Sequence, residues 1–179
     1  FFVATPLQLA TATAVVANRG KWHAPRMLKG IKGVNEVNES VLTMPDIAGV
    51  KRPPQDVKLN NPKHWDDIIK GMQMVMHGER GTARRSGDGS SYEIAGKTGT
   101  AQVVGIKQDE EYDAEKLAEI HRDHALFVAF APIDDPKIAI SVIVENGGGG
   151  SSTAAPIARK VMDAYLLGID PQAEEEKSL

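Results

Sequence analysis

Two short apolar segments joined by a turn-forming sequence constrain the fold of this chain more than any other feature. The first runs from Ala125 to Ala131 and the second from Ile138 to Val144, with Pro-Ile-Asp-Asp-Pro before the second. Both have the length and the apolar content of strands, and proline and aspartate favour turns. The pattern predicts an antiparallel hairpin with strands near 125–132 and 137–145. A third strand is predicted near 92–104.

Helical signals surround these strands. Thr5 precedes a proline, and Gln8 stands where it can close a capping box. The apolar residues of this first helix lie all round it, which predicts burial on most faces. The glycines at 147–150 are interpreted as a flexible hinge before the last helix, and Gly168 as its stop. The predicted helices span residues 6–18, 62–77 and 153–167, which makes the fold class α+β, an antiparallel sheet flanked by helices.

The remaining segments have the composition of loops. Glycine, proline, asparagine and serine are frequent in them, and sustained periodicity is missing. We expect a short extended segment at 24–31, loops at 33–61 and 81–91, a surface excursion at 107–124 with a short charged helix over 113–122, and a mobile acidic tail at 171–179. The folded part is therefore expected to span residues 1–170.

Composition excludes several classes of protein. The 179 residues include no cysteine, which rules out disulfides, thiol catalysis and thiolate zinc sites. The 21 basic and 24 acidic side chains give a net charge of −3, which argues against a nucleic-acid partner. No uninterrupted apolar stretch is long enough to cross a membrane. Because the first residue is Phe1 and not Met, we expect a piece of a longer protein.

Residues 95–102 carry the most specific candidate chemistry. They read Ala-Gly-Lys-Thr-Gly-Thr-Ala-Gln and lie on the third predicted strand. The Lys97 ammonium and the hydroxyls of Thr98 and Thr100 can converge on a carboxylate. Gly99 leaves room for a peptide added along the strand, and the Thr100 N–H can face an oxyanion. The alternative is structural, because lysine on an edge strand protects against aggregation.

Six short segments, spread over nearly the whole chain, carry a family resemblance. They are Ala4–Ala10, Ala17–Gly20, Gly81–Ala83, Ala95–Val103, His124–Pro132 and Val144–Gly148. Taken in this order, they resemble class B penicillin-binding proteins. The connection from Gln102 to the strand at Ala125 is long, and in this it is similar to the elongation-type penicillin-binding protein 2 branch of Gram-negative bacteria. The resemblance implies a penicillin-binding-protein/serine β-lactamase-like fold, with residues 1–170 as the C-terminal portion of the transpeptidase domain.

The resemblance also implies an activity, a peptidoglycan D,D-transpeptidase that forms a serine acyl-enzyme with stem peptides and is blocked by β-lactams. Lys97 would join the proton network, Thr98 and Thr100 would bind the donor carboxylate, and the Thr100 N–H would be an oxyanion donor. Gly99 and Gln102 would line the same substrate strand. No cofactor or metal is implied. The whole protein would be anchored in the inner membrane, act in the periplasm and bind cell-elongation membrane proteins.

One departure from the family pattern limits what this chain can do. The family places its nucleophile in Ser-x-x-Lys and a partner in Ser-x-Asn, and no serine of this sequence fits either element. We therefore expect the nucleophile and the base upstream of Phe1, and this segment alone to be inactive.

Two other functions remain open, a non-catalytic sensor of β-lactams or stem peptides and a β-lactamase-like hydrolase. Other residues favour structural interpretations. His121 and His124 have no third metal ligand in evidence. The glycines at 147–150 lack the Lys-Ser/Thr ending of a phosphate loop.

Overall fold

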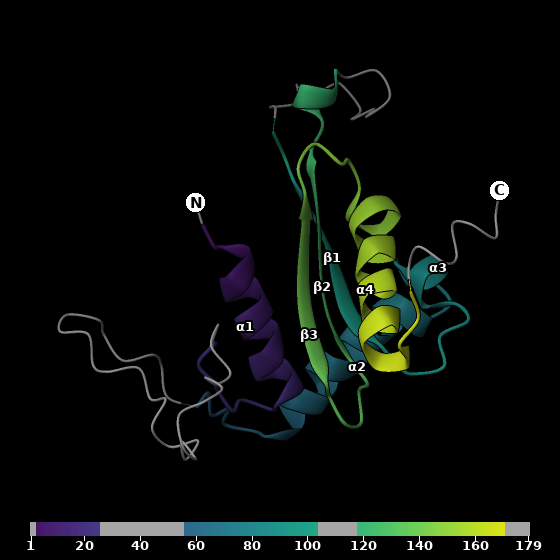
Figure 1. The fold of residues 1–179 in the computed structure, drawn as a ribbon. Coiled ribbons are helices and arrows are strands. Elements are labelled where there is room, and N and C mark those ends of the chain that lie inside the picture. Colours follow the sequence, from purple (N-terminus) through teal and green to yellow (C-terminus); the bar gives the residue numbers. More distant parts are fainter. Residues whose placement is uncertain (1–2, 26–55, 104–117, 171–179) are drawn as a thin grey trace, which may run out of the picture.

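The sheet and its helices form three layers in the computed structural model, which describes residues 3–25, 56–103 and 118–170. Figure 1 shows α1 on one side of the sheet and α4 on the other. The predicted α+β class with an antiparallel sheet is confirmed. In chain order the elements are α1 (Pro6–Ala17), α2 (Lys63–His77), α3 (Arg84–Gly87), β1 (Ala95–Ala101), the 3-10 turn η2 (Glu119–His121), β2 (His124–Ala131), β3 (Ile138–Val144), the π-helical turn η3 (Gly150–Ala154) and α4 (Ala155–Leu167).

The three strands lie in the order β1-β2-β3, and both neighbouring pairs are antiparallel. The predicted hairpin is confirmed, because Ala131 pairs with Ile138 at the turn and Ala125 pairs with Val144 at the other end. This order puts β1 at one edge of the sheet.

β1 is shorter than the predicted strand at 92–104 because backbone groups beyond both of its ends bond elsewhere. The Ile94 N–H donates to Nε2 of His77 at 3.0 Å, and the Val103 N–H donates to the Asp123 carboxylate at 3.3 Å. Both partners are distant in sequence, so local strand propensity could not reveal them.

Alternation along β2 separates two hydrophobic clusters on opposite faces of the sheet. Phe127 lies in the cluster that includes Met162 of α4, and we call this side the α4 face. Phe130 lies with Ala17 of α1 and Ile69 of α2 on the other side, the α1 face. Both phenylalanines are fully buried. Truncating either one to alanine would cost about 3–5 kcal/mol of stability.

Helix α2 crosses the edge of the sheet beside the first residues of β1. Ile69 belongs to the cluster on the α1 face, whereas Met76 belongs to the cluster on the α4 face. A Cβ on Gly96 of β1 would lie 3.2 Å from Sδ of Met76 and 2.5 Å from Phe127, so this crossing needs a glycine. Met76 is fully buried and Met74 is 57% exposed, so the methionines of this helix include both core and surface residues.

The start and stop of α1 follow the sequence signals. The Gln8 N–H donates to Oγ1 of Thr5, and Oε1 of Gln8 accepts from the Thr5 N–H, which completes the capping box. After the helix, Gly20 has a φ of +96°, and a Cβ there would lie 2.1 Å from the Val57 carbonyl oxygen. Glycine therefore allows the left-handed turn that brings the chain against residue 57.

The prediction that α1 is buried on most faces is wrong for the described part of the chain. Only Thr13, Val15 and Ala17 are buried, and Leu7 is 59% exposed. The physical reason is that the sheet covers one side of the helix. The other side opens on a cavity of about 510 Å³ that α1 shares with Trp22, Pro25 and Val57.

Two segments expected to be irregular contain helical turns. The segment at 81–91 holds α3, and the glycines at 147–150 lead directly into η3. The hinge interpretation is not supported, because Gly150 is buried and Oγ1 of Thr153 donates to the Gly147 carbonyl at 2.8 Å. Helix α4 ends as predicted at Gly168, whose φ is +69°.

Several expectations fall wholly or partly outside the described residues. They concern most of the extended segment at 24–31, most of the loop at 33–61, the first part of the charged helix at 113–122 and the tail at 171–179. From residue 118 onward that charged segment is described, and it forms only the turn η2. None of the described helices is long and apolar enough to cross a membrane.

Candidate active site on the edge of the sheet

The candidate residues Lys97, Thr98, Gly99 and Thr100 lie on β1, whose outer edge is accessible. Within residues 3–25, 56–103 and 118–170, no strand pairs with this edge. Lys97, Thr100 and Ala101 are exposed, and Thr98 and Gly99 are partly exposed. An open strand edge of this kind can take up an extended peptide as an additional strand.

The register of β1 sorts the candidate side chains onto two faces. Thr98 is paired with Phe127, whose ring lies on the α4 face, so the hydroxyls of Thr98 and Thr100 project on that face. Lys97 precedes Thr98 and starts from the α1 face, and its Nζ donates to the Thr98 carbonyl oxygen at 2.7 Å. The structure therefore brings the two threonines together and leaves the ammonium at the strand edge.

The absence of a side chain at Gly150 lets η3 touch the backbone of β1. A Cβ on Gly150 would lie 2.4 Å from the Gly99 carbonyl oxygen and 2.3 Å from that of Leu126. A Cβ on Gly99 would lie 3.2 Å from Cβ of Leu126, which is tight but not forbidden. Gly150 thus brings the start of the last helix against the candidate strand.

Gln102 is the first residue after β1 and is exposed. The next residue, Val103, is held by the carboxylate of Asp123. This contact fixes where the chain leaves the strand and places Gln102 beyond Thr100 along the same edge.

Thr82 is the site residue that sequence reasoning missed. Its Oγ1 lies 3.3 Å from Oγ1 of Thr98, within hydrogen-bonding reach. The loop that carries it is tightly held, because the Ala83 N–H donates to the Val75 carbonyl and a Cβ on Gly81 would lie 2.5 Å from that same oxygen. The family resemblance of Gly81–Ala83 was the sequence signal that could have identified it, but that resemblance alone assigned no role to the threonine.

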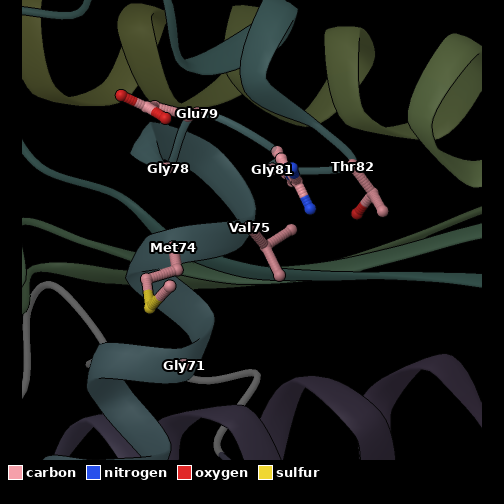
Figure 2. Close-up of a pocket in the computed structure, with 8 residues that line it drawn as sticks. Gly71, Met74, Val75, Gly78, Glu79, Gly81 and Thr82 are labelled. Carbon is pink, nitrogen blue, oxygen red and sulfur yellow. The ribbon is translucent and has the colours of Figure 1, made fainter.

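Thr82 also lies where two surface cavities meet. The first, of about 480 Å³, follows the outer side of α2 and the loop at 78–82. Figure 2 shows the side chains of Val75 and Thr82 pointing toward the strands and Glu79 pointing away from them. The second, of about 350 Å³, is lined by residues 81–85 together with Ser151 and Ser152. It lies between that loop and η3.

His124 takes part in a backbone network at the end of β2. Its Nδ1 accepts the Asn146 N–H at 2.9 Å, and Nδ2 of Asn146 donates to the carbonyls of Ile120 and Arg122, each at 3.0 Å. These contacts hold η2 against the end of β3. Among the described residues, no three histidine, aspartate or glutamate side chains are grouped so that they could hold a metal ion.

Comparison with known protein families shows which family this chain is similar to. Residues 3–163 match the family described as "Penicillin binding protein transpeptidase domain". The match contains the whole of β1, the loop with Thr82 and the first part of α4, up to residue 163. The chain belongs to this family. The Lys-Thr-Gly element of this penicillin-binding-protein transpeptidase chain therefore lies on an open strand edge, beside the loop that carries Thr82.

Individual relatives agree with the family assignment and with the resemblance to penicillin-binding protein 2. The peptidoglycan D,D-transpeptidase MrdA of Haemophilus influenzae is 44% identical over 178 residues, 98% of this chain and 26% of that protein. The crystal structure of Pseudomonas aeruginosa PBP2 in complex with WCK 5153 has a TM-score of 0.70 and 46% identity, covering 92% of this chain and 31% of that one. A complex between PBP2 and MreC from Helicobacter pylori has a TM-score of 0.65 and 31% identity, covering 92% and 25%.

This transpeptidase-family chain spans about a quarter of the length of the curated relatives it matches. Its sequence contains the Lys-Thr-Gly element but neither Ser-x-x-Lys nor Ser-x-Asn. Of the three elements of the family pattern, this chain therefore contains the Lys-Thr-Gly element, which lies on β1.

Proposed function

We propose that the protein containing this chain is a peptidoglycan D,D-transpeptidase that cross-links stem peptides during cell-wall elongation. The observation that carries the proposal is the open edge of β1, where Thr98 and Thr100 present hydroxyls on one face in a chain of the transpeptidase family. The edge offers main-chain groups to an extended peptide, and the hydroxyls offer donors to its terminal carboxylate.

Each candidate residue has a role in this proposal. The hydroxyls of Thr98 and Thr100 bind the donor carboxylate, and the Thr100 N–H donates to the oxyanion that forms on the donor carbonyl. Lys97 supplies a positive charge and a proton-transfer partner at the strand edge. Gly99 keeps the strand surface free for the peptide backbone, and Gln102 contacts the peptide farther along. One oxyanion donor typically contributes about 100- to 1,000-fold to the rate.

The reaction has two steps. A serine oxygen attacks the carbonyl of the penultimate D-Ala, the terminal D-Ala leaves as an amine, and an ester to the serine remains. An amine of a second strand then attacks this ester, forms the cross-link and releases the serine. β-Lactams imitate the donor and stop at the ester. The serine and its base lie upstream of Phe1 in this proposal, since no serine of the chain fits the family pattern.

The setting of the protein is part of the same proposal. We infer a periplasmic domain of an inner-membrane-anchored protein, with residues 1–170 as the C-terminal portion of its transpeptidase domain. The Helicobacter pylori PBP2 structure is a complex with MreC. A partner from the cell-elongation machinery is therefore proposed here as well.

The test is fluorescent penicillin labelling of the full-length protein, followed by mass mapping of the labelled peptide. We expect the label on a serine upstream of Phe1 and cross-linked muropeptides from stem-peptide substrates. Labelling without any cross-linked product would favour a sensor, and rapid β-lactam turnover would favour a hydrolase. Folded full-length protein that takes no label would overturn the proposal.

A further inference from the structure

The cavity of about 350 Å³ beside Thr82 is positively charged. Arg84, Arg85, Ser151 and Ser152 line it, and none of the described residues that line it is acidic. Nε of Arg84 is 3.7 Å from the Asp88 carboxylate, an exposed and weak contact, whereas Arg85 is exposed and pairs with no acidic side chain of the described chain. Two guanidinium groups and two hydroxyls around one hollow match the chemistry of a carboxylate ligand.

This cavity continues directly from the threonine hydroxyls of β1. Thr82 lines it, and Oγ1 of Thr82 is 3.3 Å from Oγ1 of Thr98. On its other side, Ser151 and Ser152 follow Gly150, which is packed against Gly99. A ligand held by Thr98 therefore has the cavity next to it, on the α4 face of the sheet.

The proposed function, on which this inference rests, sets the direction of the donor peptide. Its reacting carbonyl faces the Thr100 N–H, and its terminal carboxylate, which binds the hydroxyls of both Thr98 and Thr100, extends from there to Thr98. The terminal residue therefore points to the Thr82 end of the edge. The donor's preceding residues extend the opposite way, toward Gln102. After the first step the terminal residue departs from the Thr82 end, and the acceptor amine must occupy the place that it leaves. The cavity thus lies beside the incoming acceptor.

We propose that this cavity binds a carboxylate of the acceptor strand, so that the protein prefers acidic acceptors. The acceptor nitrogen forms a bond to the acyl carbon, the ester bond to the serine oxygen breaks, and the amine proton passes to that oxygen. Arg85 takes no part in these bond changes. It holds the side-chain carboxylate of the acceptor and thereby positions the amine.

The test uses the full-length protein, a donor peptide that forms the acyl-enzyme, and D-glutamate or D-glutamine as acceptor. The two acceptors have nearly the same shape and differ in one side-chain charge. The measured quantity is the ratio of amide product to hydrolysed donor. Both products form from the acyl-enzyme, so their ratio does not depend on the acylation rate. We expect a ratio about fivefold higher with D-glutamate, as for a partly exposed charge-assisted hydrogen bond.

Variants connect this preference to the cavity. Arg85→Gln should reduce the fivefold preference to nearly none, while Arg85→Lys should retain part of it. Arg80→Gln is the matched control, because Arg80 lies in the same region and lines the neighbouring cavity but not this one. It should keep the full preference. Equal ratios for the two acceptors in the unmodified protein, or an undiminished preference in Arg85→Gln, would refute the acceptor site while leaving the transpeptidase function intact. Absence of any acyl-enzyme in the unmodified protein would refute both.

Discussion

Gly150 lies against the backbone of Gly99, so the first turn before α4 rests directly on the candidate strand. The contact depends on the missing side chain, since a Cβ on Gly150 would come within 2.4 Å of the Gly99 carbonyl oxygen and also approach Leu126. Backbone atoms cannot give way as a flexible side chain can. The position of β1 and the position of α4 are therefore coupled at this point.

Gly150→Ala should displace η3 from β1. Overpacking of this kind costs about 1–3 kcal/mol, and the shifted strand should also slow acylation by penicillin. Thermal unfolding and the labelling rate of the full-length protein measure the two effects. Gly71→Ala is the control, because a Cβ on Gly71 of α2 meets no atom within 4 Å. It should be neutral or stabilise by up to about 1 kcal/mol. An unchanged unfolding temperature in Gly150→Ala would contradict the coupling.

The sequence predicted features whose signals are local. The capping box of Thr5 and Gln8, the stop at Gly168 and the hairpin between β2 and β3 each depend on neighbouring residues, and the structure contains all of them. Such signals work because propensity, turn chemistry and apolar patterning act over a few residues.

The features that sequence reasoning missed depend on contacts between distant segments. A run of glycines has the composition of a hinge, and only the approach of Gly150 to Gly99 shows that it is packed. The ends of β1 are set by His77 and Asp123, which capture backbone N–H groups from elsewhere in the chain. Thr82 belongs to the site only because its loop folds back onto Thr98.

Lys97→Ala tests the proposed role of the ammonium. Lys97 is exposed and its Nζ bonds the carbonyl of its neighbour, so its removal should change stability by no more than about 0.5 kcal/mol. Loss of a proton-transfer partner should nevertheless slow acylation by about 100-fold or more. The labelling rate of the full-length protein is the measurement. Lys137→Ala, which removes an exposed lysine paired with Asp135 in the β2–β3 turn, should label at the normal rate. A normal labelling rate in Lys97→Ala would contradict the proposed role of the Lys97 ammonium in acylation.

Asn146 should contribute to stability in two ways, through its backbone conformation and through its side-chain hydrogen bonds, and two substitutions separate these contributions. Its φ is +55°, and its side chain donates to the carbonyls of Ile120 and Arg122. Asn146→Ala removes both hydrogen bonds and strains the backbone, at a cost of about 2–3 kcal/mol, whereas Asn146→Gly removes the bonds without the strain and should cost about 1 kcal/mol less. Thermal unfolding of both variants distinguishes the two contributions. Equal losses would mean that the backbone conformation contributes nothing.

Tyr92, which precedes β1 by three residues, links this segment to α4 through a hydrogen bond whose strength should depend on pH. Its hydroxyl donates to Oδ1 of Asp163 at 2.6 Å, and Arg159 bonds the same carboxylate. Burial of the phenol, and next its hydrogen bond to Asp163, raise the pKa of Tyr92 well above its ordinary value of 10.0. A raised pKa means that folding favours the neutral phenol. The resulting stability is complete below pH 10 and is lost as the pH rises above it, where the unfolded chain releases its proton first.

Tyr92→Phe should therefore destabilise the protein by about 1 kcal/mol at pH 8. Because phenylalanine does not titrate, the difference between the unmodified protein and the variant should shrink as the pH is raised from 8 to above 10. Thermal unfolding of the pair at both pH values measures this difference and cancels the titration of all other groups. Tyr165→Phe is the control, since Tyr165 is 65% exposed on the same helix α4, and it should show little difference at either pH. A Tyr92→Phe difference that stays constant with pH would show that the phenol has the same pKa in the folded and unfolded chain.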